Sequence, residues 1–497
     1  MFLLGIDLGT SSVKISVVDA ATRRAVASVQ YPETEAEILT PQPGWAEQDP
    51  EIWWQNTKNA IKKSHATGKY DPKEIKAIGI AYQMHGLVMT DAAGNSLRNS
   101  IIWCDSRAVQ TGQQAFDAVG HAFSLHHHLN SPGNFTASKL AWVKENEPDL
   151  YEKADKVMLP GDFIAFKLSG SMTTSVSALS EGVFWDFRSN TLSESLLNYF
   201  GFSAGLFPEI RPVFSVHGEV SAEVAQELGL AQGVPIGYKA GDQPNNALSL
   251  NVLEPGEVAA TAGTSGVIYG VSDALVYDPA SRVNTFAHVN YLPEHIRTGI
   301  LLCINGTGIL YSWARKILGG HFSYPELNRL AAQAALGADG LKVLPFGNGA
   351  ERILDNRTIG AHIENIDLNR HTAAHILKAI HEGIAFSFRY GLDIMRENGY
   401  DPSVIKAGNS NLFLSEVFRQ DFVGATGVPV ELYDHDGSVG AALGAGLGTG
   451  HYSTAAEAFS NLEKIRTVAP EATGRYNELY EEWKEILNLK LQNNGNR

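Results

Sequence analysis

The sequence predicts an α/β fold in two similar halves, and three observations support this prediction. Strand-like and helix-like hydrophobic patterns alternate along the 497 residues, which is typical of α/β proteins. A turn rich in glycine and small hydroxyl residues, G-T-S-S-V at 9–13, has a counterpart, G-T-S-G-V at 263–267, about half the chain further on. The length allows about three average domains or two large ones, and the repeated turn favours two.

The first half contains several predicted strands and one well-delimited helix. Apolar runs or alternation predict strands at residues 3–6, 13–18, 25–30 and 77–81. The first two of these strands are separated by a span that suits a hairpin loop. Asp49 as N-cap and Pro50 at the first helical position predict a helix that runs to about residue 63.

The second half begins in the same way. Predicted strands at 258–261 and 267–269 flank the second glycine turn, and L-E-P-G at 253–256 marks a seam between domains 1–250 and 251–497. A single repeated turn can arise by chance, but its place between two strands near the start of each half argues for a duplicated architecture.

Three further segments follow in the second half. A helix with apolar residues every four positions is predicted after Thr372, with Gly399 as its C-terminal cap. The glycine-rich run at 444–450 lacks the flanks of a dinucleotide-binding motif, so close helix packing is the preferred interpretation. The tail after Ala469 is polar and is expected to end in a frayed terminus.

Composition excludes several classes of function. Lys and Arg total 39 and Asp and Glu total 54, a formal net charge of −15, which argues against nucleic acid as a main partner. Two cysteines rule out a disulfide framework and fit a reducing cytosol. No run approaches ~18 apolar residues, so no membrane helix is expected, and the first residues do not resemble a signal peptide. The sequence therefore predicts a cytoplasmic protein with no membrane partner; a homodimer is compatible with it.

The first glycine turn has the chemistry of a phosphate site. Gly9, Thr10 and Ser11 would expose backbone N–H groups and hydroxyls together, a concavity that binds phosphate oxygens. Lys14 on the next strand can offset phosphate charge. Asp7 at the end of the preceding strand could hold Mg²⁺, usually through water, because Mg²⁺ keeps much of its hydration shell.

The second glycine turn would supply a matching phosphate-binding site. Gly263, Thr264 and Ser265 could bind the same polyphosphate from the opposite side. Either turn alone is more simply explained as a tight turn. The pair, together with Asp7, favours nucleotide phosphate binding.

The motifs of the whole chain resemble one family. The segment 5–14, G-I-D-L-G-T-S-S-V-K, is similar to the opening phosphate loop of the FGGY carbohydrate kinases, within the actin-like ATPase superfamily. Further family motifs follow in order: W-A-E-Q-D-P at 45–50, Q-M-H-G at 83–86, W-C-D-S-R at 103–107, K-L-A-W at 139–142, L-P-G-D at 159–162 and G-D-Q at 241–243. The resemblance covers nearly the whole chain, and Q-M-H-G is similar to the xylulokinases in particular.

The resemblance implies two ribonuclease H-like domains with the active site in the cleft between them. It implies that Asp242 is the general base, which takes the proton of a sugar hydroxyl as that hydroxyl attacks the γ-phosphorus of ATP. Met84 and His85 would contact the sugar, and Asp105 and Arg107 would belong to the same wall.

The chain also departs from the family pattern. A-G-N-S at 407–410 stands where the family usually has G-G-G-A, so Gly408 and Asn409 fall at the implied adenosine site. Gln243 replaces the usual Asn after the catalytic aspartate and is one methylene longer, which can alter the sugar contact. A-L-S-E-G at 178–182 stands where D-A-S-G is usual.

These observations predict transfer of the γ-phosphate of Mg-ATP to the terminal hydroxyl of a ketopentose, with D-xylulose giving D-xylulose 5-phosphate. A sister kinase for ribulose, gluconate or glycerol is the nearest alternative, although Q-M-H-G argues against glycerol. A non-catalytic ATP-binding switch resembling actin is the alternative from another class, and G-D-Q at 241–243 argues against it.

Overall fold

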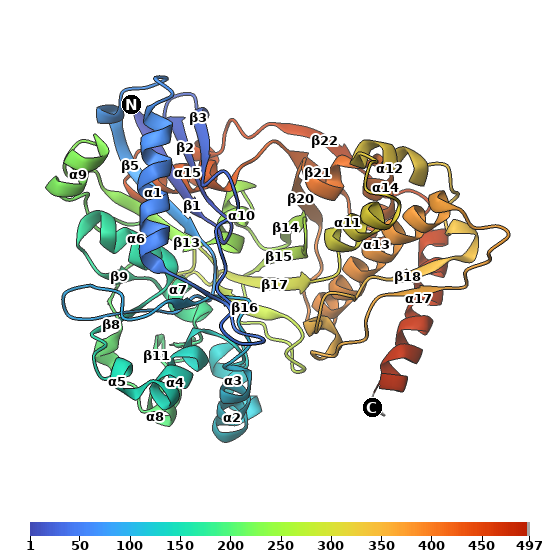
Figure 1. Cartoon of the computed structure of the whole chain (residues 1–497), viewed down its shortest axis with the longest axis horizontal. Coiled ribbons are helices and arrows are strands. Elements are labelled where there is room, and N and C mark those ends of the chain that lie inside the picture. Colours follow the sequence, from blue (N-terminus) through green and yellow to red (C-terminus); the bar gives the residue numbers. More distant parts are fainter. Residues whose placement is uncertain (495–497) are drawn as a thin grey trace.

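The computed structural model describes residues 1–494 and contains a sheet in each half of the chain (Figure 1). The first sheet has the strand order β13-β5-β1-β2-β3. Its strands are β1 (Phe2–Leu8), β2 (Val13–Asp19), β3 (Arg24–Tyr31), β5 (Ile75–Tyr82) and β13 (Ile236–Gly241). The pairs β1–β2 and β2–β3 are antiparallel, whereas β5 pairs in parallel with both β1 and β13. The predicted strands of this half are all present.

The second sheet repeats this arrangement with additional strands. Its order is β16-β17-β15-β14-β20-β21-β22. The strands are β14 (Glu257–Ala262), β15 (Gly266–Ser272), β16 (Asn284–Ala287), β17 (Thr298–Ile304), β20 (Val404–Gly408), β21 (Val430–Tyr433) and β22 (Lys464–Val468). The hairpin β14–β15 and the parallel partners β20 and β21 correspond to β1–β2, β5 and β13. The repeated turn therefore reflects a repeated topology.

Helices cover both sheets. α1 (Pro50–His65) lies against β2 and β3, with Asp49 as its N-cap as predicted. α13 (Ala373–Glu397) follows the N-cap Thr372 and ends just before Gly399, whose φ is +81°. The remaining helices of four or more residues are α2 (Val109–Val119), α3 (His121–His128), α4 (Thr136–Asn146), α5 (Pro148–Tyr151), α6 (Pro160–Ser169), α7 (Val176–Glu181), α8 (Glu194–Phe200), α9 (Ala222–Leu228), α10 (Asp242–Ser249), α11 (Gly308–Ile317), α12 (Tyr324–Ala331), α14 (Glu416–Thr426), α15 (Gly437–Gly448), α16 (Ala455–Ala458) and α17 (Thr473–Asn494).

Short strands complete the loops between these elements. They are β4 (Glu47–Gln48), β6 (Val88–Thr90), β7 (Ser100–Ile101), β8 (Lys156–Met158), β9 (Thr173–Thr174), β10 (Trp185–Asp186), β11 (Thr191–Leu192), β12 (Glu209–Ile210), β18 (Lys342–Leu344) and β19 (His362–Glu364). Most of them belong to the segment between β5 and β13, which forms the lower left part of Figure 1.

The segment after Ala469 was predicted to be a polar tail that ends in a frayed terminus; most of it is instead helical, and its last residues, 495–497, lie outside the described residues. Residues 473–494 form the long helix α17, and Tyr480, Trp483 and Leu487 on it are almost completely buried in the core of the second half. Their spacing places them on one face of a helix. The many charged residues of the opposite face made the segment look uniformly polar.

The glycine-rich run near residue 444 lies in α15, which packs against the first sheet although in sequence it lies between β21 and β22 of the second sheet (Figure 1). Contact is close because glycines on the sheet leave room for the helix backbone, and Gly448 of the run approaches the Gly237 carbonyl oxygen of β13 in the same way, with a built Cβ at 1.7 Å. A Cβ built on Gly79 would lie 1.9 Å from the Ala441 carbonyl oxygen, and one on Gly5 would lie 1.7 Å from that of Ser438. Close helix packing, rather than dinucleotide binding, therefore explains the run.

Candidate active site

Two carboxylates meet at one edge of the first sheet. Asp7 is near the carboxyl end of β1, and Asp242 is the first residue of α10, directly after β13. Both strands run parallel to β5, which lies between them, so their carboxyl ends share an edge. The start of α15 completes the corner, since a Cβ on Gly437 would lie 2.9 Å from Asp7 Oδ2.

The surroundings raise the pKa of both carboxyl groups toward neutral pH. Burial, and then the negative charge of Asp7, raises the pKa of Asp242 to about 7, against hydrogen bonding from Gln243. Burial raises the pKa of Asp7 to about 6, although the Lys14 charge opposes this shift. A carboxylate whose pKa lies near the working pH is suited to general-base catalysis.

His85 and Met84 lie beside this corner. Met84 is almost fully buried, and a Cβ on Gly241 would lie 2.7 Å from its Cγ. The His85 imidazole is in edge contact with Phe135 at 4.9 Å between ring centroids, and Phe286 of the second half lies at 5.6 Å. Burial, together with the Lys139 and Arg352 charges, lowers the pKa of His85 to about 3. The imidazole is therefore neutral and offers one donor and one acceptor.

Asp105 and Arg107 lie behind this surface. The Asp105 side chain is fully buried and accepts hydrogen bonds from Ala46 N at 2.6 Å and from Arg107 Nη2 at 2.7 Å. The Arg107 guanidinium also pairs with Glu47 at 2.8 Å and stacks over Trp45 at 3.8 Å. Both side chains are therefore buried and paired with each other, and they support the wall from behind.

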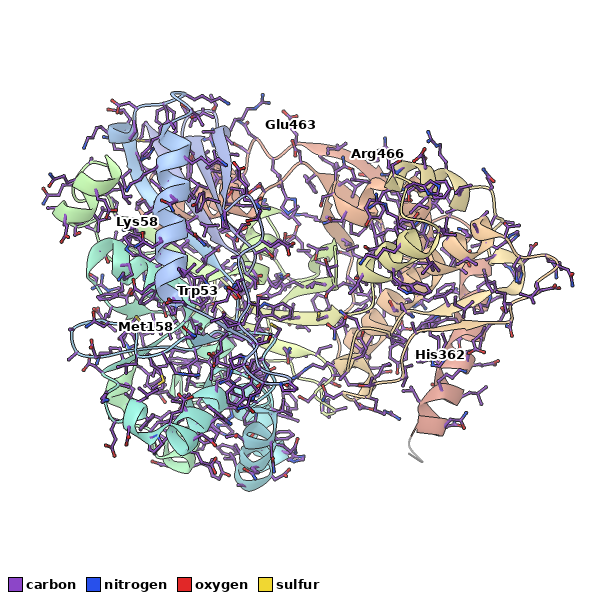
Figure 2. The ribbon with its side chains drawn as sticks, in the orientation of Figure 1. Trp53, Lys58, Met158, His362, Glu463 and Arg466 are labelled. Carbon is purple, nitrogen blue, oxygen red and sulfur yellow. The ribbon has the colours of Figure 1, made fainter. Side chains whose placement is uncertain are left out.

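Trp103 is a candidate ligand contact that sequence reasoning missed. Its side chain is half exposed, and its indole N–H donates to Thr10 Oγ1 at 2.9 Å. Thr10 Oγ1 donates in turn to Gln83 Oε1 at 3.2 Å. Gln83 Nε2 continues the network to Gln48 Oε1, which also accepts from the buried Trp53 of α1. Trp53 is labelled on this helix in Figure 2. The sequence signal that could have identified Trp103 is its place as the first residue of the W-C-D-S-R motif at 103–107.

The first turn is more tightly involved in internal contacts than expected. Gly9 N donates to Ser12 O, and Ser11 O accepts from Ala36 N. The Lys14 side chain is exposed and is paired in register with Asp7. The turn therefore places Lys14, Asp7 and the Thr10 hydroxyl at the same edge of the sheet.

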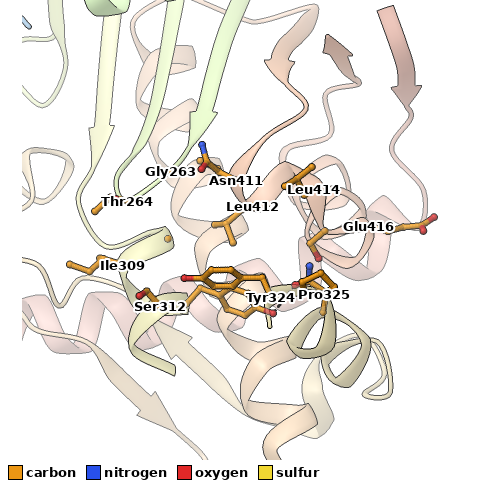
Figure 3. Close-up of a pocket in the computed structure, with 15 residues that line it drawn as sticks. Gly263, Thr264, Ile309, Ser312, Tyr324, Pro325, Asn411, Leu412, Leu414 and Glu416 are labelled. Carbon is orange, nitrogen blue, oxygen red and sulfur yellow. Dashed lines mark hydrogen bonds between the residues drawn. The ribbon is translucent and has the colours of Figure 1, made fainter. Parts of the chain in front are cut away.

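The second turn opens onto a cavity of about 620 Å³ (Figure 3). Gly263 and Thr264 line its inner end, and their carbonyl oxygens accept from the first amides of α11. Tyr324, Leu412 and Leu414 supply apolar surface, whereas Asn328 and Asn411 add amide groups. This size and mixed lining fit a nucleoside. Ser265 follows in the turn but does not line the cavity.

Gly408 and Asn409 lie next to this cavity's lining segment rather than in it. A Cβ on Gly408 would lie 2.4 Å from the His435 ring, and Asn409 N donates to Tyr433 O. The cavity is lined instead by the following residues, from Asn411 to Glu416. Asn409 therefore precedes the residues that line the cavity and does not line it itself.

The carboxylates fit a hydrated metal ion better than a protein cage. Within residues 1–494 no group of three or more His, Cys, Asp or Glu side chains is arranged as a metal site. Asp7 is a hard oxygen donor, and Gly437 leaves room beside its Oδ2 where any side chain would intrude. Mg²⁺ prefers such a site, with one carboxylate and several waters.

Comparison with known proteins assigns the family. Residues 2–249 match the N-terminal domain of the FGGY family of carbohydrate kinases, and residues 258–448 match its C-terminal domain. The chain belongs to the FGGY family. It is therefore a sugar kinase with the two-domain actin-like fold, and the predicted fold class is confirmed.

Individual relatives agree with this assignment. The xylulose kinase of Escherichia coli is 31% identical over 444 residues, which cover 89% of this chain and 88% of that protein. The crystal structure of a xylulose kinase from Rhodospirillum rubrum superposes with a TM-score of 0.88 at 25% identity, and each chain is covered completely. A gluconate kinase from Lactobacillus acidophilus shares the fold at 22% identity, with a TM-score of 0.88 over 99% of this chain and 98% of that one.

An FGGY kinase acts on a sugar and a nucleotide, and both halves contribute to the region described here. Among the described residues no helix is long and apolar enough to cross a membrane. Both cysteines, Cys104 and Cys303, are free thiols.

Proposed function

We propose that this FGGY kinase transfers the γ-phosphate of ATP to the terminal hydroxyl of D-xylulose and forms D-xylulose 5-phosphate in the cytoplasm. The observation that carries the proposal is the half-buried Asp242, whose pKa is raised to about 7 and whose neighbour Gly241 packs against Met84 of the His85 turn. Relatives named xylulose kinase, including those of E. coli and Staphylococcus epidermidis, span most of the chain. The two free thiols support a reducing compartment.

In this proposal the first half binds the sugar and the second half binds the nucleotide, with the boundary near residue 250. The sugar lies against His85 and Gln243, above the buried Met84, with Asp105 and Arg107 behind. Asp242 accepts the proton of the attacking hydroxyl, whose oxygen forms the new bond to phosphorus while the bond to the ADP oxygen breaks. Phosphoryl transfer has a loose transition state, so positioning contributes more than base strength.

The two glycine turns are assigned to the phosphates. Gly9, Thr10, Ser11 and Lys14 approach from the first half, and the turn at 263–265 approaches from the second. The nucleoside lies in the 620 Å³ cavity, with Gly408 and Asn409 behind its lining segment. When bound, Mg²⁺ neutralises phosphate charge, and Asp7 is the residue that would hold it through water.

The sugar itself is tested with a substrate panel. ADP release is measured with D-xylulose, D-ribulose, gluconate and glycerol, and xylulose should give the highest kcat/KM. A higher value for another substrate would reassign the protein to a sister activity. Family membership argues against the actin-like switch, and a switch would show no stimulation by any sugar.

The base is tested with Asp242→Asn, which keeps the size of the side chain but cannot accept the proton. Turnover should fall by about 10²–10⁴-fold, while the Kd for ATP in the absence of sugar changes little. Near-normal turnover of the folded variant would refute the role of Asp242.

A further inference from the structure

The backbone of His85 is in a conformation that non-glycine residues rarely adopt. Its φ is +61°, in the left-handed region. A side chain held there is disfavoured unless the surroundings fix it, and such residues cluster at functional sites. The contacts that fix the His85 peptide are therefore of functional interest.

Two buried charged side chains hold it from opposite sides. Glu181 Oε1, at the end of α7, accepts a hydrogen bond from the His85 backbone N–H at 2.7 Å. Lys139 Nζ, in the first turn of α4, donates to the His85 carbonyl oxygen at 2.8 Å. Glu181 is 1% exposed and Lys139 is 0% exposed. Both polar groups of the His85 backbone are thus bonded to side chains rather than to a neighbouring strand.

The same two side chains connect His85 to the rest of the site. Lys139 Nζ also donates to Ile102 O at 3.0 Å, directly before Trp103. A Cβ on Gly241, the residue before Asp242, would lie 2.8 Å from Glu181 Oε2. Glu181 therefore lies between the His85 turn and the strand end that presents the catalytic carboxylate.

We propose that Glu181 and Lys139 are positioning residues for sugar phosphorylation: they hold the His85 peptide in its left-handed conformation and so keep the imidazole in register with Asp242. This inference rests on the proposed function, in which His85 binds the sugar. Neither residue touches the sugar; both act through the imidazole, which is also packed against Phe135 and Phe286.

The chemistry of the contact indicates which replacements preserve it. Burial and the nearby charges of Asp242 and Asp162 raise the pKa of Glu181 well above its ordinary value, although the His85 N–H opposes the shift. The contact with His85 requires only an acceptor oxygen from Glu181, and within residues 1–494 its Oε2 has no hydrogen-bond partner. A glutamine carbonyl can accept the same bond, whereas methionine has a similar length but only a weak acceptor.

The experiment compares Glu181→Gln with Glu181→Met. The KM for D-xylulose should stay within about threefold of the wild-type value in the glutamine variant. In the methionine variant it should rise about tenfold or more, as expected when a buried N–H loses its acceptor. Lys139→Met should act in the same direction. The Kd for ATP without sugar should be unchanged in all three variants, which also reports that they are folded.

A double-mutant cycle separates positioning from general destabilisation. If Glu181 acts through the imidazole, Glu181→Met should add little to the loss of kcat/KM caused by His85→Ala. Glu382→Met is a matched control, because Glu382 is also a buried carboxylate that accepts one backbone N–H, from Gly337 at 2.8 Å in the second half. It should lower the melting temperature without raising the KM for the sugar.

The outcomes distinguish this inference from the proposed function. If His85→Ala leaves kcat/KM for xylulose unchanged, the assignment of His85 to the sugar fails. If His85→Ala lowers kcat/KM but the Glu181→Met effect is fully additive, or if the two Glu181 variants behave alike, the positioning role is wrong and the sugar assignment stands.

Discussion

The carboxyl group of Asp242 lies at the end of a buried strand, next to a second carboxylate, and this gives the enzyme a testable pH dependence. Its pKa is raised to about 7, so the group is protonated and unable to accept a proton at lower pH. We expect kcat/KM for the sugar to fall as pH decreases through about 7, by about tenfold for each further pH unit. Stopped assays of ADP release across this range measure the profile. A profile that stays level well below pH 7 would contradict the assignment.

The individual residues of the site could be predicted where they follow a strand or lie in a motif. Asp7 and His85 follow buried apolar runs that the sequence displays locally, whereas Asp242 was assigned from the G-D-Q motif through the family resemblance. Glu181 and Trp103 were not assigned because their partners, His85 and Thr10, lie roughly ninety positions away. Residues of one motif can also differ in burial. Asp105 and Arg107 share the W-x-D-x-R motif with Trp103, but their side chains are buried behind the wall whereas Trp103 is half exposed.

At the scale of elements, α15 determines how the carboxylate corner is closed. The helix can approach β1 and β5 only because Gly5 and Gly79 carry no side chains. Its first residue, Gly437, lies beside Asp7. A displacement of this helix is therefore expected to alter both stability and the metal-dependent step.

Gly79→Ala tests this contact. The added methyl group would lie 1.9 Å from the Ala441 carbonyl, so the helix must shift. Overpacking of this kind typically costs about 1–3 kcal/mol, and we expect a lower melting temperature together with reduced kcat. Gly474→Ala in α17 is the control, because a Cβ there meets no atom within 4 Å among the described residues. It should leave both quantities essentially unchanged, and equal effects of the two substitutions would contradict the role given to α15.

The strands β1, β2, β3, β5, β14 and β15 and the helix α13 were predicted because their hydrophobic patterns are continuous and local. The docking of α15 on the first sheet was not predicted, since nothing in a glycine-rich helix indicates which of two similar sheets it meets. α17 was missed because its buried apolar side chains, which lie between Tyr476 and Leu491, are outnumbered by polar and charged neighbours when composition alone is considered.

At the scale of the whole molecule, α17 joins the last part of the chain to the core of the second half. Trp483 is fully buried, and its indole N–H donates to Val343 O at 2.8 Å. Trp483→Ala should destabilise this half by about 3–5 kcal/mol, whereas Leu489→Ala on the exposed face of the same helix should have little effect. Scanning calorimetry of both variants measures the difference. An unchanged transition for Trp483→Ala would show that α17 is dispensable.

The passage of α15 from the second half onto the first sheet also limits how such kinases can be recombined. An exchange at residue 250 would keep Gly5 and Gly79 but would import the helix that must fit against them. In a hybrid of two distant relatives, α15 of one protein would thus pack poorly against β1 and β5 of the other, even if each half were folded. We therefore expect that substrate specificity is transferred better by grafting the loops around His85 and Trp103 than by exchanging halves. Such a graft leaves α15 packed against its own Gly5 and Gly79.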